Sequence, residues 1–100
     1  MRYFVAVAEE LHFSRAADRL CISQPSLSIQ IKKLESSLGV ALFERTKRSA
    51  NLTKPGKVFY QECISILSAA DRAISLTLAS SEEAGAKIVV GFQANAAAEL

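Results

Sequence analysis

The feature that most constrains this fold is a pair of short helix-forming runs separated by a tight break. The first run, SRAADRL, starts at Ser14, a good N-cap, and turns the small residues Ala16 and Ala17 inward, where another helix can cross closely. The break is the pentapeptide CISQP, which ends at Pro25. Two helices joined by so short a turn are predicted to form a helix-turn-helix.

The second run has a clear start signal and a clear stop signal. Ser23 is predicted to cap its N-terminus, and Pro25 falls in the first turn, where the missing N–H costs nothing. Gly39 is typical of the left-handed residue that ends a helix. Between these signals the apolar side chains recur at spacings of four, three and four, which predicts one buried stripe of Leu27, Ile31, Leu34 and Leu38.

Further elements are predicted on either side of these two helices. Residues 1–10 are apolar at helical spacing and have no cap before them, which predicts a first helix that began further upstream. Residues 41–53 have strand-like ends around a basic tip, so that Phe43 is expected to pair near Leu52 in a hairpin. We therefore predict a mainly α fold, a winged helix-turn-helix of three short helices and a two-stranded wing over residues 1–57.

A long helix is predicted to follow, over residues 54–82. Thr53 is its cap, and Pro55 again occupies a first turn. A helix of this length extends about 42 Å at roughly 1.5 Å per residue, more than the small domain can cover. An uncovered apolar stripe predicts a dimerisation helix that pairs with its own copy; a helix folded back on the domain is the alternative. The predicted dimerisation residues are Phe59, Cys63, Ile66, Leu67, Ala70, Ile74, Thr77 and Leu78.

The charges are distributed unevenly along the chain. Residues 1–57 contain ten basic and five acidic side chains, a net charge of +5, whereas residues 58–100 contain two basic and five acidic ones, a net charge of −3. This asymmetry indicates a polyanionic partner for the first part only.

Several other classes of protein do not fit this sequence. Cys21 and Cys63 are the only cysteines and there is one histidine, so no metal site is expected, and both thiols are predicted to be buried and reduced. His12 beside two glutamates has no nucleophile motif near it, so no enzyme is expected. We see neither a signal peptide nor an uncharged apolar run of membrane-spanning length, which favours a cytoplasmic protein without a membrane partner.

Five short sequence motifs in this chain form a specific pattern. The strings FSRAA, ISQPSLS, LESSLG, LFER and LTKPG occur in this order and at set spacings. They resemble the N-terminal DNA-binding domain of LysR-type bacterial transcriptional regulators over about residues 3–57, and the likeness continues through the linker helix. The later string KIVVGF looks like the first strand of that family's effector-binding domain, so residues 83–100 are expected to be a hinge and the start of a truncated domain.

The resemblance and the helical geometry agree on which residues would contact DNA. A major groove about 12 Å wide admits an α-helix. The N-terminal part of the helix between Ser23 and Gly39 is expected to read bases with Gln24, Pro25, Ser26, Ser28 and Ile29. Phosphate and wing contacts are expected from Ser14, Arg15, Lys32, Lys33, Arg45, Lys47 and Arg48.

Three of these roles have open alternatives. Gln24 either pairs with adenine through both amide atoms or caps its helix. Arg45 either contacts DNA or pairs with a nearby acid and holds the wing. Lys32 and Lys33 are either phosphate contacts or ordinary solvated lysines.

Ile29 is a departure from the family pattern, because members usually carry arginine there. Isoleucine cannot bind phosphate or guanine, but it can contact a thymine methyl group, which would favour A·T pairs. The alternative is that Ile29 is a lone exposed hydrophobe of no functional importance.

The predicted function is a sequence-specific DNA-binding transcriptional regulator that reads an interrupted palindrome as a homodimer in the cytoplasm, at the nucleoid. The resemblance implies tetramers in many complete members and a small-molecule inducer bound in the missing effector domain, so no cofactor is expected in this part. The alternative is a protein-interaction module that dimerises through the linker helix with full-length regulators.

Overall fold

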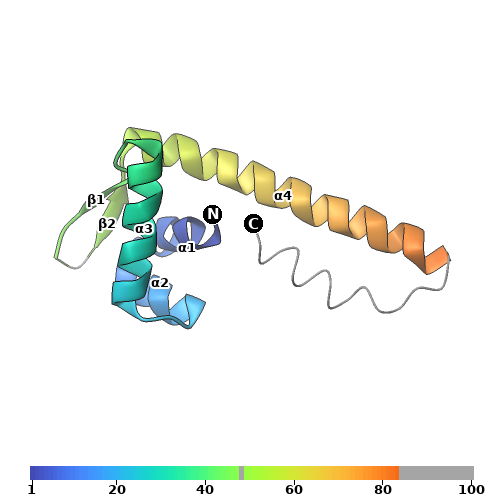
Figure 1. The fold of residues 1–100 in the computed structure, drawn as a ribbon, viewed down its shortest axis with the longest axis horizontal. Helices are drawn as coiled ribbons and strands as arrows, with labels where there is room; N and C mark the ends of the chain where they lie inside the picture. The colour runs from blue at the N-terminus through green and yellow to red at the C-terminus, as the bar shows by residue number, and fades with distance from the viewer. Residues whose placement is uncertain (48, 84–100) are drawn as a thin grey trace. The chain divides into compact units, whose positions relative to one another are not determined.

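The computed structural model describes residues 1–47 and 49–83 of this chain, which divides into two units, Met1–Cys63 and Ile64–Leu100. The predicted hinge after residue 83 and its strand lie outside the described residues, as does Arg48 at the wing tip. In chain order the elements are α1 (Arg2–Glu10), α2 (Phe13–Leu20), α3 (Gln24–Leu38), β1 (Phe43–Arg45), β2 (Ala50–Leu52) and α4 (Lys54–Glu83) (Figure 1). The predicted mainly α, winged helix-turn-helix fold is confirmed.

The first unit is built around a cluster of four phenylalanine rings from different elements. The ring of Phe4 in α1 lies 5.4 Å from Phe43 in β1 and 4.9 Å from Phe59 at the start of α4, measured between centroids. Phe13 in α2 lies 5.9 Å from Phe43, edge to face. Aromatic pairs at these distances stabilise the fold beyond the burial of their surface, so one cluster joins α1 and α2 to the wing and to the start of α4.

Helix ends follow the predicted chemistry at α3 and α4. The Ser26 N–H donates to Ser23 Oγ at 3.2 Å, and Gly39 ends α3 with φ +75°, a conformation that favours glycine. Thr53 Oγ1 accepts from the Gly56 N–H at 3.1 Å and donates to the Ala41 carbonyl at 2.6 Å, so this cap also ties α4 to the chain before β1. The three predicted end signals are confirmed.

The start of α2 was predicted wrongly. The helix begins at Phe13 rather than Ser14, and its N-cap is His12, whose Nδ1 accepts from the Arg15 N–H at 3.3 Å. Phe13 is buried among the other rings, and this burial brings the residue before it into the capping position. An imidazole is not among the preferred capping groups, which is why the hydroxyl of Ser14 seemed the better candidate.

Two predictions of burial were also wrong. Cys63 is fully buried, as predicted, but Cys21 is exposed and adopts a left-handed conformation with φ +59° at the end of α2. In the α3 stripe Leu27 and Ile31 are buried, whereas Leu38 is 45% exposed. Leu38 lines an open apolar groove with Val40 and Val58, so the last turn of the stripe lacks a cover within the described residues.

The wing is a two-stranded antiparallel hairpin with Phe43 opposite Leu52, the pairing that the apolar pattern predicted. Phe43 and Ala50 are buried, whereas Glu44 and Asn51 between them are exposed. Strand β2 therefore alternates as expected when one face of a hairpin covers a core, whereas in β1 Arg45 is exposed although it shares a face with Phe43.

Helix α4 has 30 residues, Lys54–Glu83, close to the predicted range and about 45 Å long at the usual rise. By length and composition alone, Lys54–Ser81 is apolar enough to cross a membrane, with a mean hydropathy of 1.3 in its most apolar stretch. Those two properties do not separate a membrane span from a helix that buries an apolar stripe against protein. The charged residues Asp71 and Arg72 interrupt the apolar sequence of this continuous helix.

Candidate nucleic-acid interface

The face of α3 that was predicted to point outward is exposed. Ile29 has 54% of its surface exposed, and Pro25 and Ser26 before it are exposed as well, whereas Leu27 and Ile31 on the other side are buried. Helical periodicity therefore divided the first two turns of α3 correctly into a buried and an exposed side. The other predicted contact residues of this helix are also accessible: Gln24, Lys32 and Lys33 are exposed and Ser28 is half-buried.

Two serines fix the front end of α3. Ser23 Oγ accepts from the Ser26 N–H and donates to Ser26 Oγ at 2.8 Å. The Ser26 hydroxyl is therefore held at the cap, where it retains its own proton for an outside acceptor. Because Ser23 provides the capping bond, Gln24 does not serve as the cap, and that alternative is excluded.

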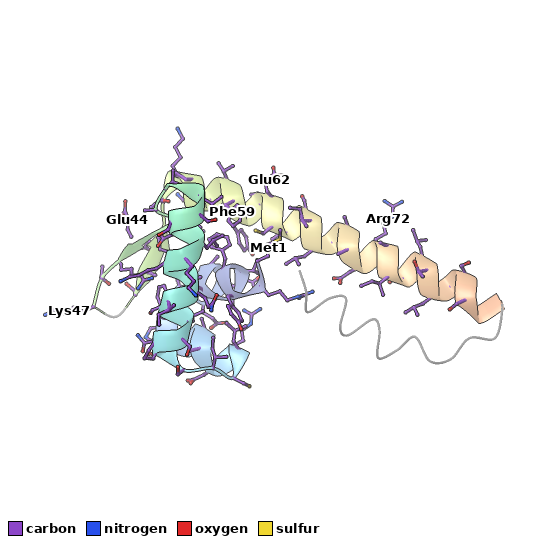
Figure 2. All side chains as sticks on the ribbon, viewed as in Figure 1. Met1, Glu44, Lys47, Phe59, Glu62 and Arg72 are labelled. Carbon is purple, nitrogen blue, oxygen red and sulfur yellow. The ribbon has the colours of Figure 1, made fainter. Side chains whose placement is uncertain are left out.

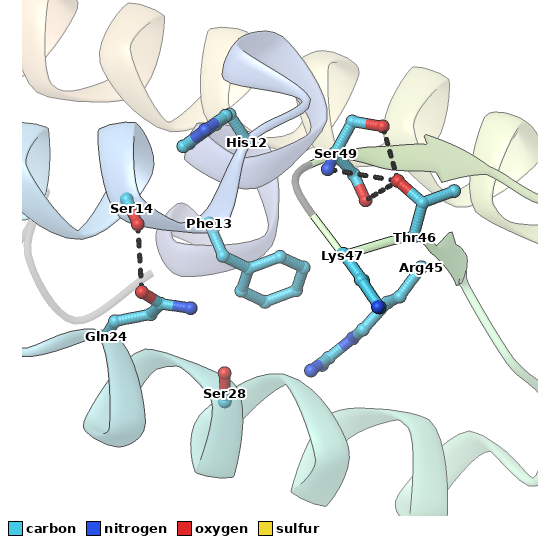
Figure 3. Close-up of a pocket in the computed structure, with 9 residues that line it drawn as sticks. All are labelled: His12, Phe13, Ser14, Gln24, Ser28, Arg45, Thr46, Lys47 and Ser49. Atoms are coloured by element: carbon cyan, nitrogen blue, oxygen red, sulfur yellow. Dashed lines mark hydrogen bonds between the residues drawn. The ribbon is translucent and has the colours of Figure 1, made fainter.

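A hydrogen bond joins the two helices of the helix-turn-helix. Ser14 Oγ in α2 donates to Gln24 Oε1 in α3 at 2.8 Å (Figure 3). Arg15 follows Ser14 in the first turn of α2 and is exposed. This bond engages the Ser14 hydroxyl proton, whereas the phosphate contact predicted for Ser14 and Arg15 relies on the free N–H groups at the start of the helix.

Arg45 holds the wing through an aromatic ring rather than through an acid. Its guanidinium carbon lies 4.1 Å from the centroid of the Phe13 ring, within the range of a cation–π contact. Among the described residues the ion pairs join Arg19 to Glu9 and Glu10, and none involves Arg45. The predicted holding role is therefore present, with a different partner.

The wing tip is closed by Thr46 and Ser49. The Thr46 N–H donates to the Ser49 carbonyl at 2.9 Å, the Ser49 N–H donates to Thr46 Oγ1 at 3.1 Å, and the two hydroxyl oxygens lie 2.8 Å apart. These bonds narrow the turn, from which the exposed Lys47 side chain projects (Figure 2).

A polar cleft of about 340 Å³ lies between the front of the helix-turn-helix and the wing. Side chains from α2, α3 and the wing turn toward it in Figure 3. It is lined by His12, Phe13, Ser14, Gln24, Ser28, Arg45, Thr46, Lys47 and Ser49. Five of the predicted DNA-contacting residues line this cleft, which brings members of the predicted base-reading and backbone sets together: Ser14, Gln24, Ser28, Arg45 and Lys47.

Glu35 fixes the wing relative to α3. One carboxylate oxygen, Oε2, accepts from the Leu42 N–H at 2.7 Å and from the Phe43 N–H at 3.3 Å. Charge-assisted bonds to backbone are among the stronger hydrogen bonds in proteins. Glu35 therefore has a structural role, because it attaches the beginning of β1 to α3.

A second polar junction joins α1, α2 and the start of α4. Arg19 Nη2 donates to Glu9 Oε1 at 2.7 Å, and Tyr60 Oη donates to Glu9 Oε2 at 3.1 Å. Partial burial and the bond to Glu9 raise the pKa of Tyr60, and the bond to Glu9 raises the pKa of Arg19. Sequence reasoning missed this junction because Glu9 and Tyr60 are 51 positions apart and belong to no shared motif.

The predicted dimerisation stripe divides between core and surface. Phe59 packs on Phe4 and Cys63 is fully buried, so these two residues serve the core of the first unit. In the second unit Ile66 is 41% exposed, and the pairing of α4 with a second copy remains a prediction. Of the others, Thr77 is exposed, Leu67 is buried, and Ala70, Ile74 and Leu78 are half-buried.

Within residues 1–47 and 49–83, no three His, Cys, Asp or Glu side chains gather where they would hold a metal ion. The cleft is lined by hydroxyl, amide, imidazole and cationic side chains, groups that can form hydrogen bonds to bases and phosphates.

Solved structures with the same arrangement include two that contain DNA. The chain matches the DNA-binding domain of BenM in its benA site 1 DNA complex with a TM-score of 0.73 and 53% identity, over 76% of this chain and 88% of that one. It matches the DNA-binding domain of CbnR in a DNA complex with a TM-score of 0.76 and 40% identity, over 80% of this chain and 92% of that one.

Curated relatives show the same likeness in sequence. The chain is 49% identical over 94 residues to the transcriptional regulator BenM of Acinetobacter baylyi, and 43% identical over 100 residues to the regulator AlsR of Bacillus subtilis. The BenM match covers 92% of this chain but only 30% of BenM, and the AlsR match covers 100% of this chain but only 33% of AlsR. The family model described as "Bacterial regulatory helix-turn-helix protein, lysR family" matches residues 1–57. This chain belongs to the LysR family of bacterial regulatory proteins.

Proposed function

We propose that this chain binds duplex DNA sequence-specifically as part of a bacterial transcriptional regulator. The observation that carries the proposal is the exposed front of α3, held by Ser23 and Ser14 beside a basic wing. An α-helix with short polar side chains at its front fits a major groove, and lysines on the same side fit the phosphates. The DNA complexes of the similar BenM and CbnR domains support this assignment.

The proposed binding unit is a homodimer. Each copy would insert one α3 into a half-site of an interrupted palindrome and place its wing against the adjacent backbone, and α4 would pair the copies. Two-fold symmetry in the protein then appears as inverted symmetry in the DNA site. The complete regulator would work in the cytoplasm at the nucleoid and form tetramers.

DNA binding by this chain is proposed to need no cofactor. A small-molecule inducer would act through an effector-binding domain, which the described residues do not include. The residues proposed to contact DNA, all within residues 1–57, are therefore expected to need no inducer for binding.

Selection of bound duplexes from random DNA tests the proposal. We expect enrichment of two inverted half-sites at a fixed spacing, and a gel shift that survives excess non-specific competitor. Gln24→Ala should remove the preference at one position in each half-site, whereas Ser36→Ala, on an exposed position further along α3, should leave the selected sequence unchanged. If no sequence is enriched, the proposal fails, and co-assembly with full-length regulators would then favour the protein-interaction alternative.

The wing has a separate test. Because each phosphate neutralised by a cation releases counterions, Lys47→Ala should lower the slope of log affinity against log salt by about 0.9. An unchanged slope would remove Lys47 from the proposed contact set.

A further inference from the structure

The hydrogen bond between α2 and α3 fixes which end of the Gln24 amide faces outward. Gln24 Oε1 accepts from Ser14 Oγ at 2.8 Å, so the carbonyl end of the amide is turned toward α2. In Figure 3 the Gln24 nitrogen points away from Ser14 and into the polar cleft. The amide therefore presents N–H donors on the side where a nucleic acid would lie.

The positions of the two residues in their helices favour this orientation. Ser14 lies in the first turn of α2, and Gln24 is the first residue of α3. The N-terminus of a helix has unsatisfied N–H groups and a partial positive charge, which favour an oxygen over an NH₂ group nearby. Both helix ends thus favour Oε1 on the inside and Nε2 on the outside.

We propose that Ser14 is a positioning residue that determines base specificity, because it makes Gln24 a hydrogen-bond donor toward the base edges. This inference rests on the proposed DNA-binding function. Pairing of glutamine with adenine requires Oε1 to accept from the adenine N6 amino group while Nε2 donates to N7. With Oε1 held on Ser14, Gln24 instead fits guanine, which offers two adjacent acceptors, N7 and O6, in the major groove.

This role differs from a phosphate contact by Ser14. The Ser14 hydroxyl has a single proton, which it donates in the hydrogen bond to Gln24 Oε1. Contacts to phosphate carry no base information, so loss of such a contact weakens binding to all sequences alike. Loss of an orienting contact instead changes the preference at the single base pair that faces Gln24.

Site selection with wild type and four variants tests the inference: Ser14→Ala, Ser14→Thr, Gln24→Ala and the Ser14→Ala/Gln24→Ala double variant. We expect wild type to select guanine at one position in each half-site. Ser14→Ala should lower the guanine-to-adenine preference there by roughly three- to tenfold, the cost of re-ordering one free side chain. Ser14→Thr keeps the hydroxyl and should keep the preference, and in the Gln24→Ala background Ser14→Ala should add nothing at this position.

Folding does not complicate the comparison, because His12 rather than Ser14 caps α2. Circular dichroism should confirm an unchanged helix content for Ser14→Ala. A uniform loss of affinity over all sequences, adenine at the Gln24 position in wild type, or an unchanged preference in Ser14→Ala would each overturn the inference while leaving DNA binding intact. If wild type selects no sequence at all, the proposed function and this inference fail together.

Discussion

Ile29 and Cys21 are both exposed side chains beside a surface proposed to contact DNA, and each differs from what its residue type usually does. Isoleucine and cysteine are commonly buried, yet Ile29 is 54% exposed on α3 and Cys21 is exposed in the turn before it. An apolar side chain at the front of α3 has no charge to offer a phosphate. A substitution of Ile29 and a thiol reagent that reacts with Cys21 test these two side chains.

Replacement of Ile29 by arginine should strengthen DNA binding. Arginine adds a positive charge and five N–H donors at an exposed position, so we expect roughly tenfold tighter binding to most duplexes and a new guanine preference at one position per half-site. Affinity measurements at fixed salt and a site selection with Ile29→Arg test this. Ile29→Lys is the matched control, because it adds the charge without the two-pronged geometry. Equal affinity and equal preference for Ile29→Arg and wild type would show that position 29 does not contact DNA.

The two thiols should differ sharply in reactivity. Cys63 is fully buried, and its burial raises the pKa of its thiol, whereas Cys21 is exposed. Since the thiolate is the reactive species, a disulfide reagent should modify one thiol per folded chain and both in denaturant. Cys21→Ser should remove the rapid reaction entirely. Rapid modification of Cys63 in the folded protein would contradict the packing at the start of α4.

At the scale of elements, the wing, α3 and α4 meet at a few backbone contacts. Glu35 binds the N–H groups of Leu42 and Phe43, and Thr53 binds the Ala41 carbonyl. Gly56 in the first turn of α4 lies so close that a Cβ atom there would overlap the Leu42 carbonyl oxygen. This close approach explains why glycine, rather than a residue with higher helix propensity, occupies position 56.

Gly56→Ala should destabilise the domain. Alanine gains about 1 kcal/mol in helix propensity, but overlap with backbone forces the elements apart and costs roughly 3 kcal/mol. The net change in the free energy of unfolding is therefore a loss of about 2 kcal/mol, measurable by urea denaturation.

Gly39→Ala is the matched control for that substitution. No atom lies within 4 Å of a Cβ at Gly39, so only the left-handed conformation (φ +75°) opposes alanine, at a cost of about 1 kcal/mol. A larger loss at Gly39 than at Gly56 would mean that the approach of α4 to Leu42 is looser than described.

For the whole molecule, local signals predicted the elements, and tertiary contacts determined the rest. Ser23, Gly39 and Thr53 act on their own helix ends, so sequence alone located them. The cap at His12 was missed because the burial of Phe13, a tertiary effect, sets the start of α2. The bond from Ser14 to Gln24 was missed for the same reason: it depends on how closely two helices approach.

Assembly is the property of the whole molecule that most needs a measurement. Ile66 lies on the predicted dimer stripe and is 41% exposed, so Ile66→Glu should not disturb the chain itself. A charge on an apolar interface should weaken dimerisation by at least roughly tenfold. Sedimentation over a concentration series measures this, with Ser68→Glu on the opposite side of α4 as the control. A monomeric wild type, or equal effects of both variants, would contradict self-pairing through this stripe.

The Glu35 carboxylate has a consequence for the length of any operator. Because it attaches the start of the wing directly to α3, the helix proposed to read bases and the wing proposed to contact the neighbouring backbone are held at a constant distance. Half-sites that differ by substitution are then compatible with one protein geometry. An inserted or deleted base pair inside a half-site moves one contact out of reach. Natural operators should therefore vary in base sequence but not in half-site length.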